Sequence, residues 1–237
     1  MALLSYIVAL IAISSAFQEQ VRSEYDFIRL VQLWSNSICL HFGPIQCLRP
    51  TPLSRATLHG VWPDNWTVPL FDCAINPNNA YINLRTPRQI DRRDYYWWNY
   101  KLPSHPTIND QRWWAHEWDK HGTCSLNRFT QRGYFQLAEN LMSRYDVTTI
   151  LKRDIQTRYP LIAQVNQSIS QFTGFRPELR CQPYRGLNML VEMIICFDRT
   201  GTSIIDCPVL TTSCGWSVTN TIYVPGLQLI RPTQFGV

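Results

Sequence analysis

Hydrophobic residues alternate with polar ones in some stretches of the chain and recur at helical spacing in others. Alternation, or a short apolar run bounded by turn residues, predicts a β-strand. The strands predicted in this way are Tyr25–Leu33, a strand that starts at Thr57 and carries His59, Leu187–Phe197 and Ser203–Asp206. The four residues 198–201 between the last two strands indicate a hairpin. Gly60 and Pro63 are expected to end the strand that carries His59.

Apolar residues spaced three and four apart predict helices. The helices expected are Asp91–Trp98, Trp113–His121, Phe129–Arg144, Asp146–Arg158 and Leu161–Phe172. The remainder of Asn65–Arg112 lacks a period and is expected to form loops, and Cys39 and Cys47 are expected to flank another short loop. This mixture predicts an α+β fold, an antiparallel β-sheet with several packed α-helices, held by disulfide bonds.

The candidate chemistry is concentrated in the predicted helix that begins at Trp113. With about 100° of rotation per residue, His116, Glu117, Lys120 and His121 fall within an arc of about 140°. Two imidazoles, a carboxylate and an ammonium group would therefore share one side of a short helix.

Tryptophans surround these charges. Trp113 joins the same arc, whereas Trp114 and Trp118 lie towards the other side and would anchor the helix in a core. Gly122 is expected to end the helix.

Two other interpretations of this stretch compete with catalysis. A zinc site of the protease type needs histidines four residues apart, but His116 and His121 are five apart and Lys120 would repel a cation. No metal and no other cofactor is therefore expected. The second alternative is a solvated charged face, which the interleaved tryptophans disfavour.

The beginning of the chain is typical of a secretory signal peptide. Residues 2–16 form an apolar run too short to span a bilayer comfortably, and a polar segment with small residues follows. We expect a signal peptide at residues 1–23 and one domain at residues 24–237, with cleavage after Ser23 or, alternatively, after Ala16. The mature protein would be extracellular, without a membrane anchor.

Charge and cysteine content agree with a secreted protein. The net charge is +5, and it stays +5 when residues 1–23 are removed, because one Arg and one Glu leave together. Only three basic residues are Lys, and an Arg-rich surface favours phosphate-bearing partners. All eight cysteines follow residue 23, and an even number in a secreted chain predicts disulfides. Asn65 and Asn166 each begin a glycosylation sequon.

Two histidines and a cation suit acid–base cleavage of a phosphodiester. One imidazole can take the proton of an attacking hydroxyl while another protonates the leaving oxygen, and a lysine can stabilise the developing charge. If His59 faces the helix that carries His121, RNA is the natural substrate, because it supplies its own nucleophile, the 2′-hydroxyl.

At these residues the chain resembles the ribonuclease T2 family. The resemblance rests on Leu58–Pro63, with the sequence LHGVWP, and His116–Cys124, with the sequence HEWDKHGTC, and it extends through Cys196–Asp198 and Asp206–Pro208. It implies endonucleolytic cleavage of single-stranded RNA through a 2′,3′-cyclic phosphate.

The resemblance also implies roles for individual residues. His121 would be the general base, His59 the general acid and His116 a phosphate ligand, while Glu117 and Lys120 would stabilise the transition state. Trp62 and Asp64 match positions that hold one base, and Trp113 matches an aromatic residue that stacks on the next base. The alternatives are core packing for Trp62 and Trp113 and a turn role for Asp64.

Disulfide pairing follows from the same resemblance. The pairs it implies are Cys39–Cys47, Cys73–Cys124, Cys181–Cys214 and Cys196–Cys207.

Within the family, the basic charge and the length are similar to those of plant self-incompatibility ribonucleases. This similarity implies a monomer with a protein partner of the F-box type, and segment Thr67–Asn109 is the candidate recognition surface. The alternatives are a ribonuclease for phosphate recovery or defence, and a binding or storage protein without activity.

Overall fold

The computed structural model describes residues 24–42, 55–74, 77–100, 111–208, 214 and 220–227. The signal peptide expected at residues 1–23 and the candidate recognition residues 101–109 lie outside this part. The strands are β1 Phe27–Trp34, β2 Ala56–Asp64, β3 Glu178–Tyr184, β4 Leu187–Asp198, β5 Ile204–Ile205 and β6 Ile222–Tyr223. The helices are α2 Ser35–Phe42, α3 Pro87–Tyr96, α4 Arg112–Lys120, α5 Gln131–Tyr145, α6 Thr148–Asp154 and α7 Ile162–Thr173, with short 3₁₀ turns at Pro77–Asn79 and Gly122–Ser125.

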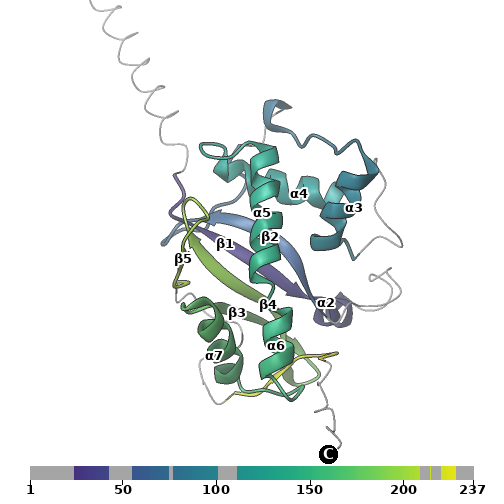
Figure 1. The fold of residues 1–237 in the computed structure, drawn as a ribbon, viewed down its shortest axis with the longest axis vertical. Helices are drawn as coiled ribbons and strands as arrows, with labels where there is room; N and C mark the ends of the chain where they lie inside the picture. Colours follow the sequence, from purple (N-terminus) through teal and green to yellow (C-terminus); the bar gives the residue numbers. More distant parts are fainter. Residues whose placement is uncertain are drawn as a thin grey trace, which may run out of the picture.

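The strands form one sheet in the order β2-β1-β4-β3, and all neighbours on this path are antiparallel. β5 pairs antiparallel with β4 as the predicted hairpin, and β6 adds a short parallel pair to β4. Helices α5, α6 and α7 pack across one face of the sheet, and α4 lies near the end of β2 with α3 beside it (Figure 1). The predicted α+β fold with a mainly antiparallel sheet is confirmed.

The main core lies between the sheet and these helices. It contains Leu30 and Leu58 from the sheet, Trp118 from α4, and Tyr134 and Phe135 from α5, all buried. Indole and phenol groups inside this core still need hydrogen-bond partners. Trp118 Nε1 donates to the carbonyl of Asn79 at 2.7 Å, and Tyr134 Oη donates to the carbonyl of Val61 at 2.8 Å. These bonds tie the helices to β2 and to the loop that follows it.

The expected end of the second strand was wrong. β2 continues through Gly60 and Pro63 to Asp64. Pro63 is tolerated because β2 is an edge strand, so its missing N–H group can fall on the side without a neighbour. His59 therefore lies within a strand.

Two elements differ from expectation as well. α2 covers residues expected to form a loop, and β3 was not expected at all. β3 carries Arg180, Gln182 and Pro183 on its exposed half, and these residues hide the alternation that marks a strand.

Three of the expected disulfides are formed, Cys73–Cys124, Cys181–Cys214 and Cys196–Cys207. The fourth expected pair involves Cys47, which lies outside the described residues. No helix in the part of the chain that the structure describes is long and apolar enough to cross a membrane.

Candidate active site

A cleft of about 280 Å³ opens between β2, α4 and the segment after β2. The side chains that line it are Arg29, His59, Trp62, Asp64, Pro69, Leu70, Phe71, His116, Glu117, Lys120, His121 and Arg180. The structure thus brings together all five residues predicted for catalysis, with two of the three predicted for base binding. The third, Trp113, does not line the cleft but stacks on His59, with 5.5 Å between ring centroids.

His59 occupies an irregularity of the sheet. Val31 of β1 pairs with Gly60, and Gln32 pairs with Leu58, so His59 is the extra residue of a β-bulge. A bulged residue is left out of the regular ladder, and bulges often redirect a side chain beside an active site. The carbonyl of His59 accepts a hydrogen bond from Trp97 Nε1 at 2.5 Å. This bond holds the backbone from which the imidazole projects.

Helix α4 presents the other candidate catalytic side chains to the cleft, as its periodicity predicted. Trp114 and Trp118 are buried in the core, and Glu117 is buried on the side that faces the cleft. His116 is exposed at the rim, and His121 follows directly at the end of the helix, where its N–H group donates to the carbonyl of Glu117 at 3.0 Å.

Gly122 ends the helix for a reason other than the expected one. It does not adopt the left-handed conformation of a C-terminal glycine cap; instead the chain continues into a 3₁₀ turn. A Cβ atom at Gly122 would overlap the ring of Trp118. The glycine therefore allows the indole that anchors α4 to pack against the backbone next to His121.

Aromatic rings connect the histidines of the cleft. Trp62 stacks on His121 with 4.5 Å between centroids and meets His59 edge-on at 4.9 Å. Trp113 lies between His59 and His116, nearly parallel to both rings. These contacts cover much of the ring faces of Trp62 and Trp113, which supports the packing interpretation of these tryptophans. Their predicted role in base binding stays a prediction.

Asp64 is engaged in the fold of the cleft wall. Its Oδ1 accepts hydrogen bonds from the N–H groups of Asn65 and Leu70, at 2.9 and 3.0 Å, and its Oδ2 pairs with Arg29 Nε at 2.9 Å. The carboxylate thus shapes the loop after β2, as in the turn alternative. Recognition of a base by Asp64 is likewise still a prediction.

Glu117 is fixed by a close approach of β2 to α4. Trp62 Nε1 donates to Glu117 Oε2 at 3.0 Å, and the other oxygen lies 3.7 Å from His59 Nε2. A Cβ atom at Gly60 would overlap both Trp62 Nε1 and Glu117 Oε2. Gly60 is therefore required for the contact between the two motifs.

The surroundings of His59 and His121 in the cleft shift the pKa values of these two residues in opposite directions. Burial, together with the positive charges of Lys120 and of the neighbouring histidines, lowers the pKa of His121 to about 3. Burial also disfavours protonated His59, but the hydrogen bond with Glu192 and the charges of Glu117 and Glu192 outweigh it, so the pKa of His59 is raised above 6.5. At mildly acidic pH one imidazole is neutral and the other charged, the pattern of an acid–base pair.

Two further groups of the cleft have shifted pKa values. Burial and the charge of Lys120 lower the pKa of His116, and burial raises the pKa of Glu117. Among the described residues, no group of three or more His, Cys, Asp or Glu side chains is arranged to hold a metal ion.

Comparison with known proteins assigns the family and the fold. A model of the ribonuclease T2 family matches residues 25–207. The chain belongs to the ribonuclease T2 family. It is 30% identical over 187 residues to Ribonuclease S-2 of Nicotiana alata, which covers 78% of this chain and 82% of that one. It is 29% identical over 205 residues to Extracellular ribonuclease LE of Solanum lycopersicum, covering 82% and 86%.

A solved structure agrees with these sequences. The self-incompatibility-associated SF11-RNase of Nicotiana alata matches with a TM-score of 0.73 and 26% identity, over 85% of this chain and 99% of that one. The protein is thus an RNA endonuclease of the T2 type.

Sequence patterns missed four charged residues of this T2 ribonuclease. Arg29, Glu178, Arg180 and Glu192 form ion pairs beneath or beside the cleft. Glu192 did carry a signal, because it is the single charged residue in the apolar run from Leu187 to Phe197. A carboxylate buried in such a strand needs a charged or hydrogen-bonding partner.

Replacing Gly60 by alanine tests the contact between the two motifs. The methyl group would separate Trp62 from Glu117, and displacements near 1 Å in an active site can cost about 100-fold in rate. We expect Gly60→Ala to lower kcat/KM for RNA by roughly 10- to 100-fold, measured by steady-state kinetics. Gly133→Ala is the matched control, because its Cβ would meet its nearest neighbour only at 3.5 Å. Equal activity of the two variants would contradict this account of Gly60.

Proposed function

We propose that this T2 ribonuclease cleaves single-stranded RNA with His121 as general base and His59 as general acid. The opposite pKa shifts of the two imidazoles across one cleft are the observation that carries the proposal. Nδ1 of His121 is buried, which leaves Nε2 to receive the proton of the 2′-hydroxyl. The 2′-oxygen then bonds to phosphorus as the bond from phosphorus to the 5′-oxygen breaks. The leaving oxygen takes a proton from His59, and the products are a 2′,3′-cyclic phosphate and a 5′-hydroxyl group.

The remaining cleft residues stabilise the phosphorane. Lys120 supplies positive charge where negative charge develops, and His116 binds a phosphate oxygen at the rim. Glu117 is buried close to His59, so it shapes the field at the reacting centre. Neither metal nor cofactor takes part in these steps.

The proposed setting is extracellular. Removal of residues 1–23, oxidation of the cysteines and glycosylation at Asn65 and Asn166 would give a secreted monomer. Three disulfides and the relative named an extracellular ribonuclease support this setting.

We further propose that the enzyme is the pistil component of gametophytic self-incompatibility, recognised by a pollen protein of the F-box type. Relatives among the S ribonucleases and the net charge of +5 support this role. The rival is a ribonuclease for phosphate recovery or defence, and enzymes of that kind tend to be acidic. A silent binding protein is disfavoured, because His59 and His121 are both present and face one cleft.

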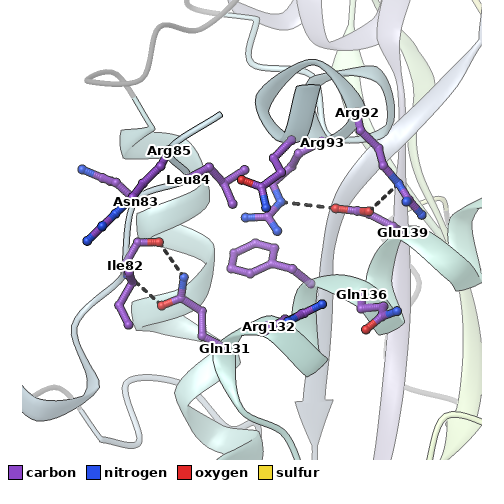
Figure 2. A pocket seen from close by; sticks show the side chains of 12 residues that line it. Ile82, Asn83, Leu84, Arg85, Arg92, Arg93, Gln131, Arg132, Gln136 and Glu139 are labelled. Carbon is purple, nitrogen blue, oxygen red and sulfur yellow. Dashed lines mark hydrogen bonds and ion pairs between the residues drawn. The ribbon is translucent and has the colours of Figure 1, made fainter. Parts of the chain in front are cut away.

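The predicted recognition segment contributes to a basic hollow outside the catalytic cleft. This hollow, of about 540 Å³, lies between residues 82–85, α3 and α5. Among the described residues, its lining contains four arginines and one carboxylate, namely Arg85, Arg92, Arg93, Arg132 and Glu139. Figure 2 shows Arg92 and Arg93 directed at Glu139, at 3.0 and 3.4 Å, with Arg85 and Arg132 placed around the same hollow. An acidic surface of a protein partner would fit it.

Replacing either catalytic histidine tests the enzymatic proposal. We expect His59→Ala and His121→Ala each to lower kcat by about 10²- to 10⁴-fold, because each proton transfer has its own imidazole. His41→Ala, on the exposed part of α2 and outside the cleft lining, is the control and should keep its rate. EDTA should leave the rate unchanged, and a DNA strand of the same sequence should stay intact. Cleavage of DNA, or more than half of wild-type activity in a catalytic variant, would reject the proposal.

The expected pH dependence of kcat/KM follows from the pKa shifts of His121 and His59. Neutral His121 is needed, so kcat/KM should rise through about pH 3, the pKa of that residue. Protonated His59 is needed as well, so kcat/KM should fall only above pH 6.5, as pH passes the raised pKa of His59. Rates on a dinucleotide measured from about pH 3 to about pH 9 check this profile. A descending limb below pH 6.5 would contradict the assignment.

Reversing the charge of two arginines in the basic hollow tests the proposed recognition by a pollen protein. We expect Arg85→Glu with Arg132→Glu to weaken binding to pollen F-box proteins of the source plant, measured by calorimetry, roughly tenfold or more. Cleavage of a dinucleotide should be unchanged, because neither side chain lines the catalytic cleft. If turnover of long RNA falls while partner binding does not move, the hollow belongs to the substrate path and the recognition proposal is wrong.

A further inference from the structure

Charged residues of alternating sign run beneath the cleft from the base-binding side to the general acid. The chain of ion pairs is Asp64–Arg29–Glu178–Arg180–Glu192–His59. It crosses all four long strands, and Arg29, Glu178 and Glu192 are almost completely buried. Buried charges persist only when they are paired and hydrogen-bonded, so each member depends on its neighbours.

The last pair of this chain holds the imidazole of His59. Nδ1 of His59 lies 2.6 Å from Glu192 Oε1, and Arg180 Nη1 donates to the other oxygen of Glu192 at 3.2 Å. A carboxylate that accepts from Nδ1–H fixes the tautomer and the rotation of an imidazole. Nε2 of His59 is thereby left on the side of the cleft.

A second bulge lies directly beside Glu192 in β4. Arg180 of β3 pairs with Glu192, and Cys181 pairs with Leu190, so Val191 is an extra residue in β4. Strict alternation would place Leu190 and Glu192 on the same face. The bulge changes the phase, so Leu190 is buried in the main core while Glu192 reaches His59. Glu192 itself lies on the face of Ile194 and Cys196, as regular alternation along this part of β4 requires.

Charge balance favours the protonated form of His59. With a neutral imidazole the ion-pair chain has three carboxylates and two guanidinium groups, and protonation of His59 makes the total zero. Other groups that face this imidazole are Glu117 from α4 and Arg180 from β3, and His116 and His121 sense its charge. Burial raises the pKa of Glu117, which weakens its contribution as an anion.

We propose that Glu192 is the positioning residue of the general acid: it aims Nε2–H of His59 at the 5′-leaving oxygen and keeps this imidazole charged, with Arg180 holding the carboxylate in place. This inference rests on the proposed role of His59. Glu192 does not line the cleft, so it acts through His59 and not on the substrate.

Leaving-group chemistry provides the test. Protonation by His59 matters for the alkoxide of a dinucleotide but little for a nitrophenolate, which leaves without a proton. Glu192→Gln keeps a hydrogen-bond acceptor and removes the charge. On a dinucleotide we expect kcat to fall by about 10- to 100-fold, a part of the contribution of a general acid, with KM nearly unchanged. On a nucleoside 3′-(p-nitrophenyl phosphate) the rate should stay within about threefold of wild type.

The pH profile and NMR give independent readouts. Loss of the Glu192 charge lowers the pKa of His59, so the alkaline limb of kcat/KM on the dinucleotide should move to lower pH. Titration of the imidazole resonances should show the same displacement for His59. Glu178→Gln is the matched control: it removes a carboxylate from the same ion-pair chain without touching His59, so its loss should be equal on both substrates.

The possible results distinguish failure of the role proposed for Glu192 from failure of the proposed function. An equal loss on both substrates, or an unmoved alkaline limb, would overturn the role of Glu192. If Glu192→Gln does not fold, as judged by circular dichroism, Glu192→Asp keeps the charge on a shorter side chain and should show the same preference for the nitrophenyl substrate. If His59→Ala itself keeps wild-type activity, the proposed function fails, whereas a normal Glu192→Gln beside an inactive His59→Ala rejects only this inference.

Discussion

The arrangement of the cleft depends on a mismatch in residue number between neighbouring strands. β2 has one residue more than β1 at His59, and β4 has one more than β3 at Val191. An unmatched residue loses its regular hydrogen bonds to the neighbouring strand. At His59, the hydrogen bond from the indole of Trp97 to the carbonyl compensates for this loss. Without these two extra residues, side chains of the sheet would follow simple alternation. As it is, Leu190 and Glu192 of β4 are two positions apart and yet lie on opposite faces, with Leu190 in the main core.

The same few contacts explain how two identical side chains can have opposite pKa shifts. His59 and His121 both touch Trp62, so their separation is set by one rigid ring. Their surroundings differ in charge: carboxylates face His59, whereas cations surround His121. Because both imidazoles are largely withdrawn from water, these charges act through a medium that screens them weakly. Position and protonation state are therefore fixed by the same packing.

Local sequence patterns correctly predicted the features that depend on residues close together in the sequence. The side of α4 that faces the cleft follows from a period of 3.6 residues, and Trp114 and Trp118 are buried as that period requires. The hairpin of β4 and β5 follows from its turn residues in the same way. Local sequence patterns failed where the structure depends on contacts between residues that are far apart in the sequence. Pro63 stays in a strand only because β2 is at an edge, and Glu192 meets His59 across 133 positions of sequence. The local periodicity of a sequence carries no information about such a pairing.

The disulfide Cys73–Cys124 has a consequence for how the chain can vary. It closes a covalent ring that contains α3 and α4, and its closure lies three residues after His121. Residues 77–100 in that ring carry three of the four arginines of the basic hollow. The disulfide, which holds the backbone next to His121, lies outside these residues. Substitutions that reshape the hollow can therefore accumulate with little displacement of the acid–base pair. The disulfide thus supports the end of α4 independently of the residues that form most of the hollow.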